Sequence, residues 1–195
     1  MIKEDKIKNY DFFLWKRFID GDQKALEEIY KSHYQALYNY GLRIHANTDI
    51  VKDAIQELFY DIISSLSTLG TTDNIRFYLI AAFRRKMMLA LKKKAEHILP
   101  ESGYEFDFDV SAEETMIKVE ENRTIQLKIR KIINNLSSRQ KEAIFLKFYN
   151  NMTYEQITQI MGINYQSARS IIYKAIHVMR EIFEQEKYAE KAKMY

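Results

Sequence analysis

Residues 153–179 read TYEQITQIMGINYQSARSIIYKAIHVM, and the rest of the chain is interpreted outward from this stretch. Thr153 followed three residues later by Gln156 is the pattern of a capping box, which predicts the start of a short helix. Gly162 can adopt the left-handed conformation that ends a helix, and Asn164 is a suitable N-cap for a second helix. Two helices joined by so short a turn predict a helix-turn-helix, a motif by which proteins bind DNA.

The second of these predicted helices has one apolar face and one polar face. Its apolar side chains recur three and four residues apart, so they are expected to be buried on one side. No acidic residue occurs between residues 164 and 180, whereas an ordinary solvated helix face, the alternative interpretation, usually mixes Glu with Lys. The polar face offers hydrogen-bonding groups for base edges and positive charge for phosphates. It is predicted to bind duplex DNA through Tyr165, Gln166, Ser167, Arg169, Ser170, Tyr173, Lys174 and His177.

Composition predicts an all-α fold. Pro100 is the only proline and there are five glycines, while good helix formers are abundant. Ser137 with Gln140, and Ser111 with Glu114, are two further capping-box patterns upstream of the helix-turn-helix. The C-terminal part of the chain is therefore expected to be a four-helix domain.

The first half of the chain is expected to form a separate helical bundle. Helices are predicted near residues 12–19, from an N-cap at Asp22 to about residue 42, from 50 to about 66, and from 74 to 94. The third of these helices has an apolar stripe that should face the core, formed by Val51, Ala54, Ile55, Leu58 and Ile62.

Charge is distributed unevenly between the two halves. Every charged residue from 76 to 94 is basic, and every charged residue from 100 to 115 is acidic. The acidic stretch lacks helical periodicity, which indicates a linker. Two basic modules joined by an acidic segment suggest a polyanion that is contacted at two places. The predicted organisation is an N-terminal domain at residues 8–96, a linker at 97–112 and a C-terminal domain at 113–186.

Several segments in this order resemble the extracytoplasmic-function type of bacterial sigma factor, over roughly residues 10–185. Residues 53–59, DAIQELF, match the Asp-x-x-Gln-Glu-x-Phe signature of that family. Residues 74–94 resemble the family's helix that contacts the minus-10 promoter element. Residues 136–146 and 162–169 resemble the opening segment and the recognition helix of its C-terminal domain. The likeness is to sigma factors of the Bacteroides group in particular.

The resemblance implies that the protein binds core RNA polymerase and directs initiation at promoters with minus-10 and minus-35 elements. It implies that polymerase is bound by Asp53, Gln56, Glu57, Phe59 and Tyr60. It implies that melted minus-10 DNA is bound by Asn74, Tyr78, Arg84, Arg85, Lys92, Lys93 and Lys94. The minus-35 duplex would be read by the polar face of the helix-turn-helix, and an anti-sigma factor would be a further partner. For the first two sets the alternative is ordinary core packing or a solvated helix face.

Other function classes fit the residues less well. The four histidines lie far apart without metal-ligand spacing, and there is no P-loop, dinucleotide-binding turn or cysteine. No catalytic residue, metal site or cofactor is therefore expected. A helix-turn-helix regulator that does not act through core polymerase remains the main alternative. The lack of cysteine and of any long apolar run predicts a cytoplasmic protein without membrane insertion.

Overall fold

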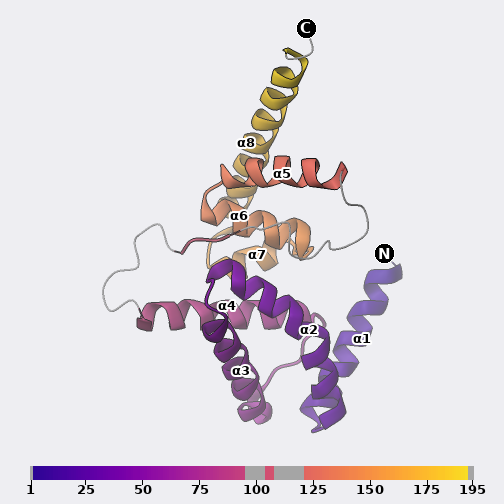
Figure 1. Cartoon of the computed structure of the whole chain (residues 1–195). Helices are drawn as coiled ribbons and strands as arrows, with labels where there is room; N and C mark the ends of the chain where they lie inside the picture. Colours follow the sequence, from indigo (N-terminus) through magenta and orange to yellow (C-terminus); the bar gives the residue numbers. More distant parts are fainter. Residues whose placement is uncertain (1, 95–103, 108–120, 193–195) are drawn as a thin grey trace. The chain divides into compact units, whose positions relative to one another are not determined.

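A computed structural model describes residues 2–94, 104–107 and 121–192 (Figure 1). Within these ranges the regular elements are all helical, which confirms the predicted all-α class. The chain divides into two compact units, Met1–Gly103 and Tyr104–Tyr195, and each has its own buried apolar core. The predicted capping box at Ser111 and the ends of the predicted linker lie outside the described residues. None of the described helices is long and apolar enough to cross a membrane.

The described part of the N-terminal unit consists of α1 (Ile2–Ile19), α2 (Gln23–Ile44), α3 (Thr48–Ser64), the short 3-10 helix η1 (Leu66–Thr68) and α4 (Ile75–Lys94). These helices pack around large side chains, of which Trp15, Tyr40 and Phe83 are fully buried. The apolar stripe predicted along α3 is buried over its whole length. The spacing of apolar residues therefore identified the core face of this helix.

Gly41 allows α2 to approach α3 and α4 closely. A Cβ atom at this position would lie 2.6 Å from Cγ1 of Val51 and 2.9 Å from the ring of Phe83. Both distances are shorter than van der Waals contact, so any larger residue would push the helices apart. This glycine is required for tight packing rather than for a turn.

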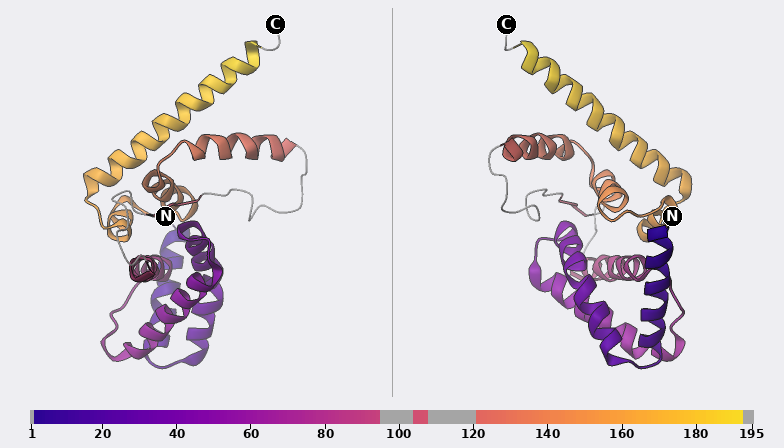
Figure 2. Two further views of the ribbon diagram at one scale, coloured as in Figure 1. Left: turned by 60° about the vertical axis from the view of Figure 1, so that its left-hand side comes forward. Right: turned by 90° about the vertical axis from the view of Figure 1, so that its right-hand side faces the viewer.

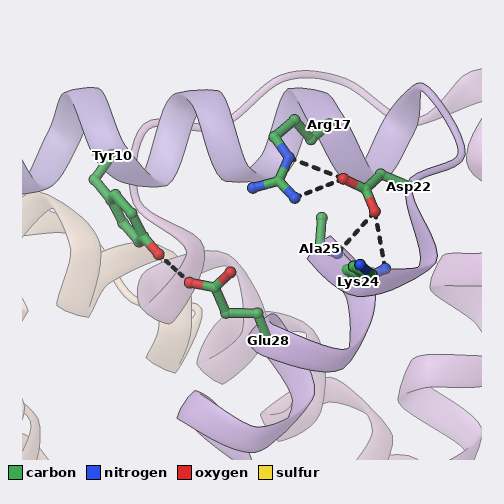
Figure 3. Close-up of polar contacts among 6 residues, drawn as sticks. All are labelled: Tyr10, Arg17, Asp22, Lys24, Ala25 and Glu28. Carbon is green, nitrogen blue, oxygen red and sulfur yellow. Dashed lines mark hydrogen bonds and ion pairs between the residues drawn. The ribbon is translucent and has the colours of Figure 1, made fainter.

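Polar side chains cap the helix starts in this unit, and the N-cap predicted at Asp22 is confirmed. The Asp22 carboxylate accepts hydrogen bonds from the backbone N–H groups of Lys24 (2.9 Å) and Ala25 (3.3 Å), and it is paired with Arg17 at 2.6 Å. Figure 3 shows this cluster, together with the hydrogen bond from the Tyr10 hydroxyl to Glu28 that joins α1 to α2. Asn47 caps α3 in the same way through the N–H groups at positions 49 and 50.

The described part of the C-terminal unit consists of α5 (Glu121–Asn134), α6 (Ser138–Ile144), the π-helical turn η3 (Phe145–Tyr149), α7 (Tyr154–Met161) and α8 (Tyr165–Ala192). The capping boxes predicted at Ser137 and Thr153 are both present. Two features differ from the sequence-based expectation. The chain continues past α6 as a π-helical turn, and the last helix, expected to be short, runs for 28 residues (Figure 2). No glycine or proline occurs after Gly162 to end α8 earlier.

Part of the predicted linker is attached to the C-terminal unit. The Tyr104 hydroxyl donates a hydrogen bond to the carboxylate of Glu142, which is completely buried in α6. Phe106 is only 1% exposed, and its ring lies 5.8 Å from that of Phe145. Phe106 therefore belongs to the core of this unit, whereas Glu105 and Asp107 beside it are exposed.

His33 gives the N-terminal unit a defined dependence on pH. Burial on α2, together with the positive charge of Arg76, lowers the pKa of His33 from 6.5 to about 4. Above pH 6.5 the imidazole is neutral in both the folded and unfolded chains, so it does not affect stability. Below pH 6.5 the unfolded chain binds a proton that the folded chain does not bind until about pH 4. The folded state is therefore expected to lose at most about 3 kcal/mol over this window.

A His33→Gln substitution should remove most of this loss. Unfolding can be followed by the fluorescence of Trp15, the only tryptophan of the chain and one with no exposed surface. Comparing the two proteins at each pH cancels the acid loss from paired carboxylates such as Asp22, whose pKa is lowered mainly by its hydrogen bond with Arg17. Parallel stability curves for the two proteins between pH 6.5 and 4 would contradict the assignment.

Candidate nucleic-acid interface

The helix-turn-helix is built by local hydrogen bonds at each of its corners. At the start of α7, the Thr153 hydroxyl accepts from the N–H of Gln156 (3.2 Å), and the Gln156 side chain accepts from the N–H of Thr153 (2.9 Å). Gly162 ends α7 in the left-handed conformation, with φ of 66°. Asn164 then accepts a hydrogen bond from the N–H of Ser167 at 2.8 Å, so it caps α8. All three predicted signals are confirmed.

Burial of one face of α8 leaves the opposite face in solvent. Ala168, Ile172 and Ala175 are buried, and they lie on the same side as the partly buried Ile171 and Ile176. α8 packs against α6 and α7, which contribute their own buried apolar residues. The small alanines allow close approach between the helices. The orientation of the polar face is therefore set by the packing of the apolar one.

The predicted duplex-binding residues differ in how far their side chains are exposed to solvent. Tyr165 and Tyr173 are 45% and 72% exposed. Ser167 and Ser170 are only partly exposed, so they are less available to a ligand. The other members of the set are fully on the surface, namely Gln166, Arg169, Lys174 and His177. His177 also lies 3.3 Å from Glu181, the first acid after the acid-free stretch. This neighbour makes His177 the least suitable phosphate contact of the group.

Two residues next to the predicted set were missed from the sequence. The ammonium of Lys147, in the turn η3, lies 4.6 Å above the centre of the Tyr154 ring and donates a hydrogen bond to the carbonyl of Met152. Tyr154 begins α7, and its ring meets that of Tyr165, the first residue of α8, at 5.9 Å. This array connects η3, α7 and α8 at the exposed end of the recognition helix. Only the fold brings these residues together, since they are up to 18 positions apart.

The residues assigned to minus-10 DNA have several different environments on α4. Asn74 precedes this helix and caps it, accepting from the N–H of Phe77 at 2.9 Å. Tyr78 is partly buried, its ring lies 4.9 Å from that of Trp15, and burial raises the pKa of its hydroxyl. Arg84 is partly buried with interactions of its own. The exposed positive charges are carried by Arg85, Lys92 and Lys93. The side chain of Lys94 lies outside the described part.

One member of the basic run on α4 is directed toward α3 instead. Lys86 is mostly buried, and its ammonium lies 2.5 Å from a carboxylate oxygen of Asp61 and 3.7 Å from one of Glu57. These contacts join the predicted DNA-binding helix to the predicted polymerase-binding helix. The sequence did not indicate this structural role, because Lys86 stands within a run of basic residues.

The residues assigned to polymerase lie along α3 beside a groove. Asp53, Gln56, Glu57 and Tyr60 are exposed, Tyr60 by 71%. Phe59 is only 6% exposed, and its ring lies 4.9 Å from that of Tyr30 on α2. The groove between α2 and α3 has a volume of about 450 Å³ and is lined by Gln23, Leu26, Glu27, Tyr30, Gln56, Phe59, Tyr60 and Ile63. An apolar floor with a polar rim is the composition expected of a protein-binding surface.

Comparison with known proteins supports an assignment to transcription. Residues 126–176, which include the helix-turn-helix, match the family described as Sigma-70, region 4. The RNA polymerase sigma factor SigV of Bacillus subtilis (strain 168) is 25% identical over 150 residues, which cover 76% of this chain and 84% of that protein. The RNA polymerase sigma factor YlaC of the same organism is 18% identical over 155 residues, with 77% and 87% covered.

Two solved structures share the fold. One is CnrH in complex with the cytosolic domain of CnrY, which covers 90% of this chain with a TM-score of 0.57 and 15% identity. The other is the sigma factor RpoE in complex with the anti-sigma factor NepR from Bartonella quintana, which covers 83% with a TM-score of 0.58 and 17% identity. Nearly the full length of each solved chain is matched, 97% and 98% respectively.

Proposed function

We propose that this chain, a sigma factor of the extracytoplasmic-function type, binds core RNA polymerase in the cytoplasm and directs it to promoters through minus-10 and minus-35 elements. The observation that carries the proposal is the exposed, acid-free face of α8, of which residues 165–176 lie within the segment that matches Sigma-70, region 4. The curated relatives are sigma factors, and their similarity extends over about three quarters of the chain.

The minus-35 element is read by α8 as duplex DNA. Arg169 is exposed in the second turn of the helix, where it can donate two parallel hydrogen bonds to a guanine edge. Gln166 and Tyr173 lie on the same exposed face, and Lys174 is available for a phosphate. Base contacts of this kind carry specificity, whereas phosphate contacts position the helix.

The minus-10 element is bound in melted form by α4 and by the loop before it. Arg85, Lys92 and Lys93 form an exposed track that suits the phosphates of a single strand. The loop carries Asn74 at its end, and residues 70, 71 and 73 are exposed. Polymerase is bound next to this site, on the rim of the groove between α2 and α3. The ion pairs of Lys86 with α3 keep the two surfaces in a fixed relation.

Two weak DNA contacts are made effective by the polymerase that holds both units. Alone, the protein is expected to bind DNA poorly, because each unit contributes few contacts. On the enzyme, the second contact is made at a high local concentration, which raises the overall affinity. DNA binding should fall steeply with salt, since phosphate contacts release counterions. An anti-sigma factor is proposed as a regulator, since the solved RpoE structure contains one.

Transcription in vitro tests the proposal as a whole. Core polymerase on genomic fragments should start RNA synthesis at new and defined positions when the protein is added. Core polymerase should also be retained by the protein in a pull-down. A protein that binds DNA but neither associates with the enzyme nor changes its start sites would instead be a helix-turn-helix regulator acting outside core polymerase.

An Arg169→Ala substitution should weaken minus-35 recognition by about 1–3 kcal/mol, because it removes a predicted base contact. The measurement is the ratio of transcription from promoters with an intact and an altered minus-35 element. Lys187→Ala is the matched control, since it removes one exposed positive charge from α8 far from the reading face. Equal effects of the two substitutions would mean that Arg169 contributes charge alone.

A double substitution of Gln56 and Glu57 by Ala should lower affinity for core polymerase while the fold stays intact. Both side chains are exposed, so their loss leaves no cavity. The matched control replaces Glu184 and Gln185, an exposed pair of the same chemistry on α8. Affinity is measured by titrating labelled protein with core enzyme, and circular dichroism checks helix content. Normal affinity of the first variant would place the docking surface elsewhere.

A further inference from the structure

Two side chains of α1 form hydrogen bonds with the backbone at the two ends of the loop between η1 and α4. The indole Nε1–H of Trp15 donates a hydrogen bond of 2.9 Å to the carbonyl of Gly70. A carboxylate oxygen of Asp11 accepts one of 3.0 Å from the backbone N–H of Ile75, the first residue of α4. These bonds connect residues 55 and 64 positions apart in the sequence. Both ends of the loop at residues 69–74 are therefore tied to α1.

The two hydrogen bonds from α1 can fix the geometry of the loop, because their donor and acceptor groups are themselves held in place. Trp15 has no exposed surface, and its ring meets those of Phe18 at 5.4 Å and Tyr78 at 4.9 Å. Its N–H therefore has a fixed direction. Asp11 lies one helical turn before Trp15, so one face of α1 carries both contacts. Burial raises the pKa of Asp11, which agrees with a carboxylate that lies partly out of water.

Local hydrogen bonds order the end of the loop, whereas its start has one long backbone bond, from the N–H of Leu69 to the carbonyl of Leu66 at 3.4 Å. The Thr72 hydroxyl accepts from the N–H of Asn74 at 3.1 Å, and Asn74 itself caps α4. In the described part of the chain, the hydrogen bond to the Gly70 carbonyl comes from Trp15 and not from a residue of the loop. Exposed residues 71 and 73 lie between the two tied ends. Loss of the α1 contacts would thus release the start of the loop while α4 remains capped.

We propose that Asp11 and Trp15 are positioning residues for minus-10 recognition, holding the loop at residues 69–74 in the conformation that receives melted promoter DNA. This inference rests on the proposed function, which assigns that loop and α4 to the minus-10 element. Neither residue contacts DNA in this proposal. They act through the loop, because a recognition loop that is already ordered loses less conformational entropy on binding.

Trp15→Phe tests the indole contact, since it keeps an aromatic ring in the core but removes the N–H donor. Asp11→Ala is a second variant, which acts on the other end of the loop and leaves Trp15 in place. Tyr10→Phe is the matched control, because it also removes one hydrogen-bond donor from α1, but from a contact with Glu28 on α2. Circular dichroism and core-polymerase affinity are measured for all three proteins.

The first readout is amide hydrogen exchange at residues 69–75 in the free protein. Exchange should accelerate roughly three- to tenfold in both loop variants, the factor that corresponds to one lost hydrogen bond. It should be unchanged in the control. Unchanged exchange in both loop variants would overturn the proposal, since the loop would then be ordered without α1.

The second readout is the transcription ratio between promoters with intact and altered minus-10 elements, measured beside the same ratio for minus-35. The loop variants should lose discrimination at minus-10 by roughly threefold or more and keep it at minus-35, because only one recognition loop is released. Equal loss at both elements, or no loss at minus-10, would refute a positioning role. A wild-type protein that redirects polymerase without discriminating at minus-10 would refute the minus-10 assignment and this inference with it. A wild-type protein that leaves start sites unchanged would refute the proposed function.

Discussion

Burial of the apolar side of α8 is the constraint on which the proposed DNA-binding surface depends. Ala168, Ile172 and Ala175 must face α6 and α7, so the residues between them face outward. The left-handed turn at Gly162 sets where this helix begins, and Lys147 with Tyr154 supports its first residue from the side. An acid-free polar face is thus directed to solvent by packing alone, which costs the fold no buried polar group.

In the N-terminal unit, contacts between residues far apart in the sequence position the proposed DNA-binding surface. Its proposed DNA-binding surface consists of an exposed basic track and a short loop, and both receive contacts from other helices. Lys86 leaves the basic track to pair with α3, and Trp15, from within the core, donates a hydrogen bond to the loop. Each contact restricts the motion of a surface that is proposed to bind a flexible single strand. Order in the free protein then lowers the entropy lost on binding.

Local signals could be predicted from the sequence, and distant pairings could not. Capping residues such as Asp22 and Thr153 act within three positions, so their patterns identified the helix starts. Periodicity likewise identified the buried stripe of α3. The hydrogen bond between Trp15 and Gly70, and the attachment of Phe106 to the C-terminal core, join positions that only the fold brings together. The sequence predicted where α8 begins but not where it ends, because no glycine or proline follows Gly162.

The central claim is that the outer face of α8 contacts promoter duplex when core polymerase holds the protein. The chain has no cysteine, so Tyr173→Cys, at a position 72% exposed, gives a single attachment point for a DNA-cleaving reagent. With core polymerase bound at a promoter, strand cuts should cluster at the minus-35 element and disappear when the enzyme is omitted. Cuts that are absent, scattered along the fragment, or independent of the enzyme would contradict the account.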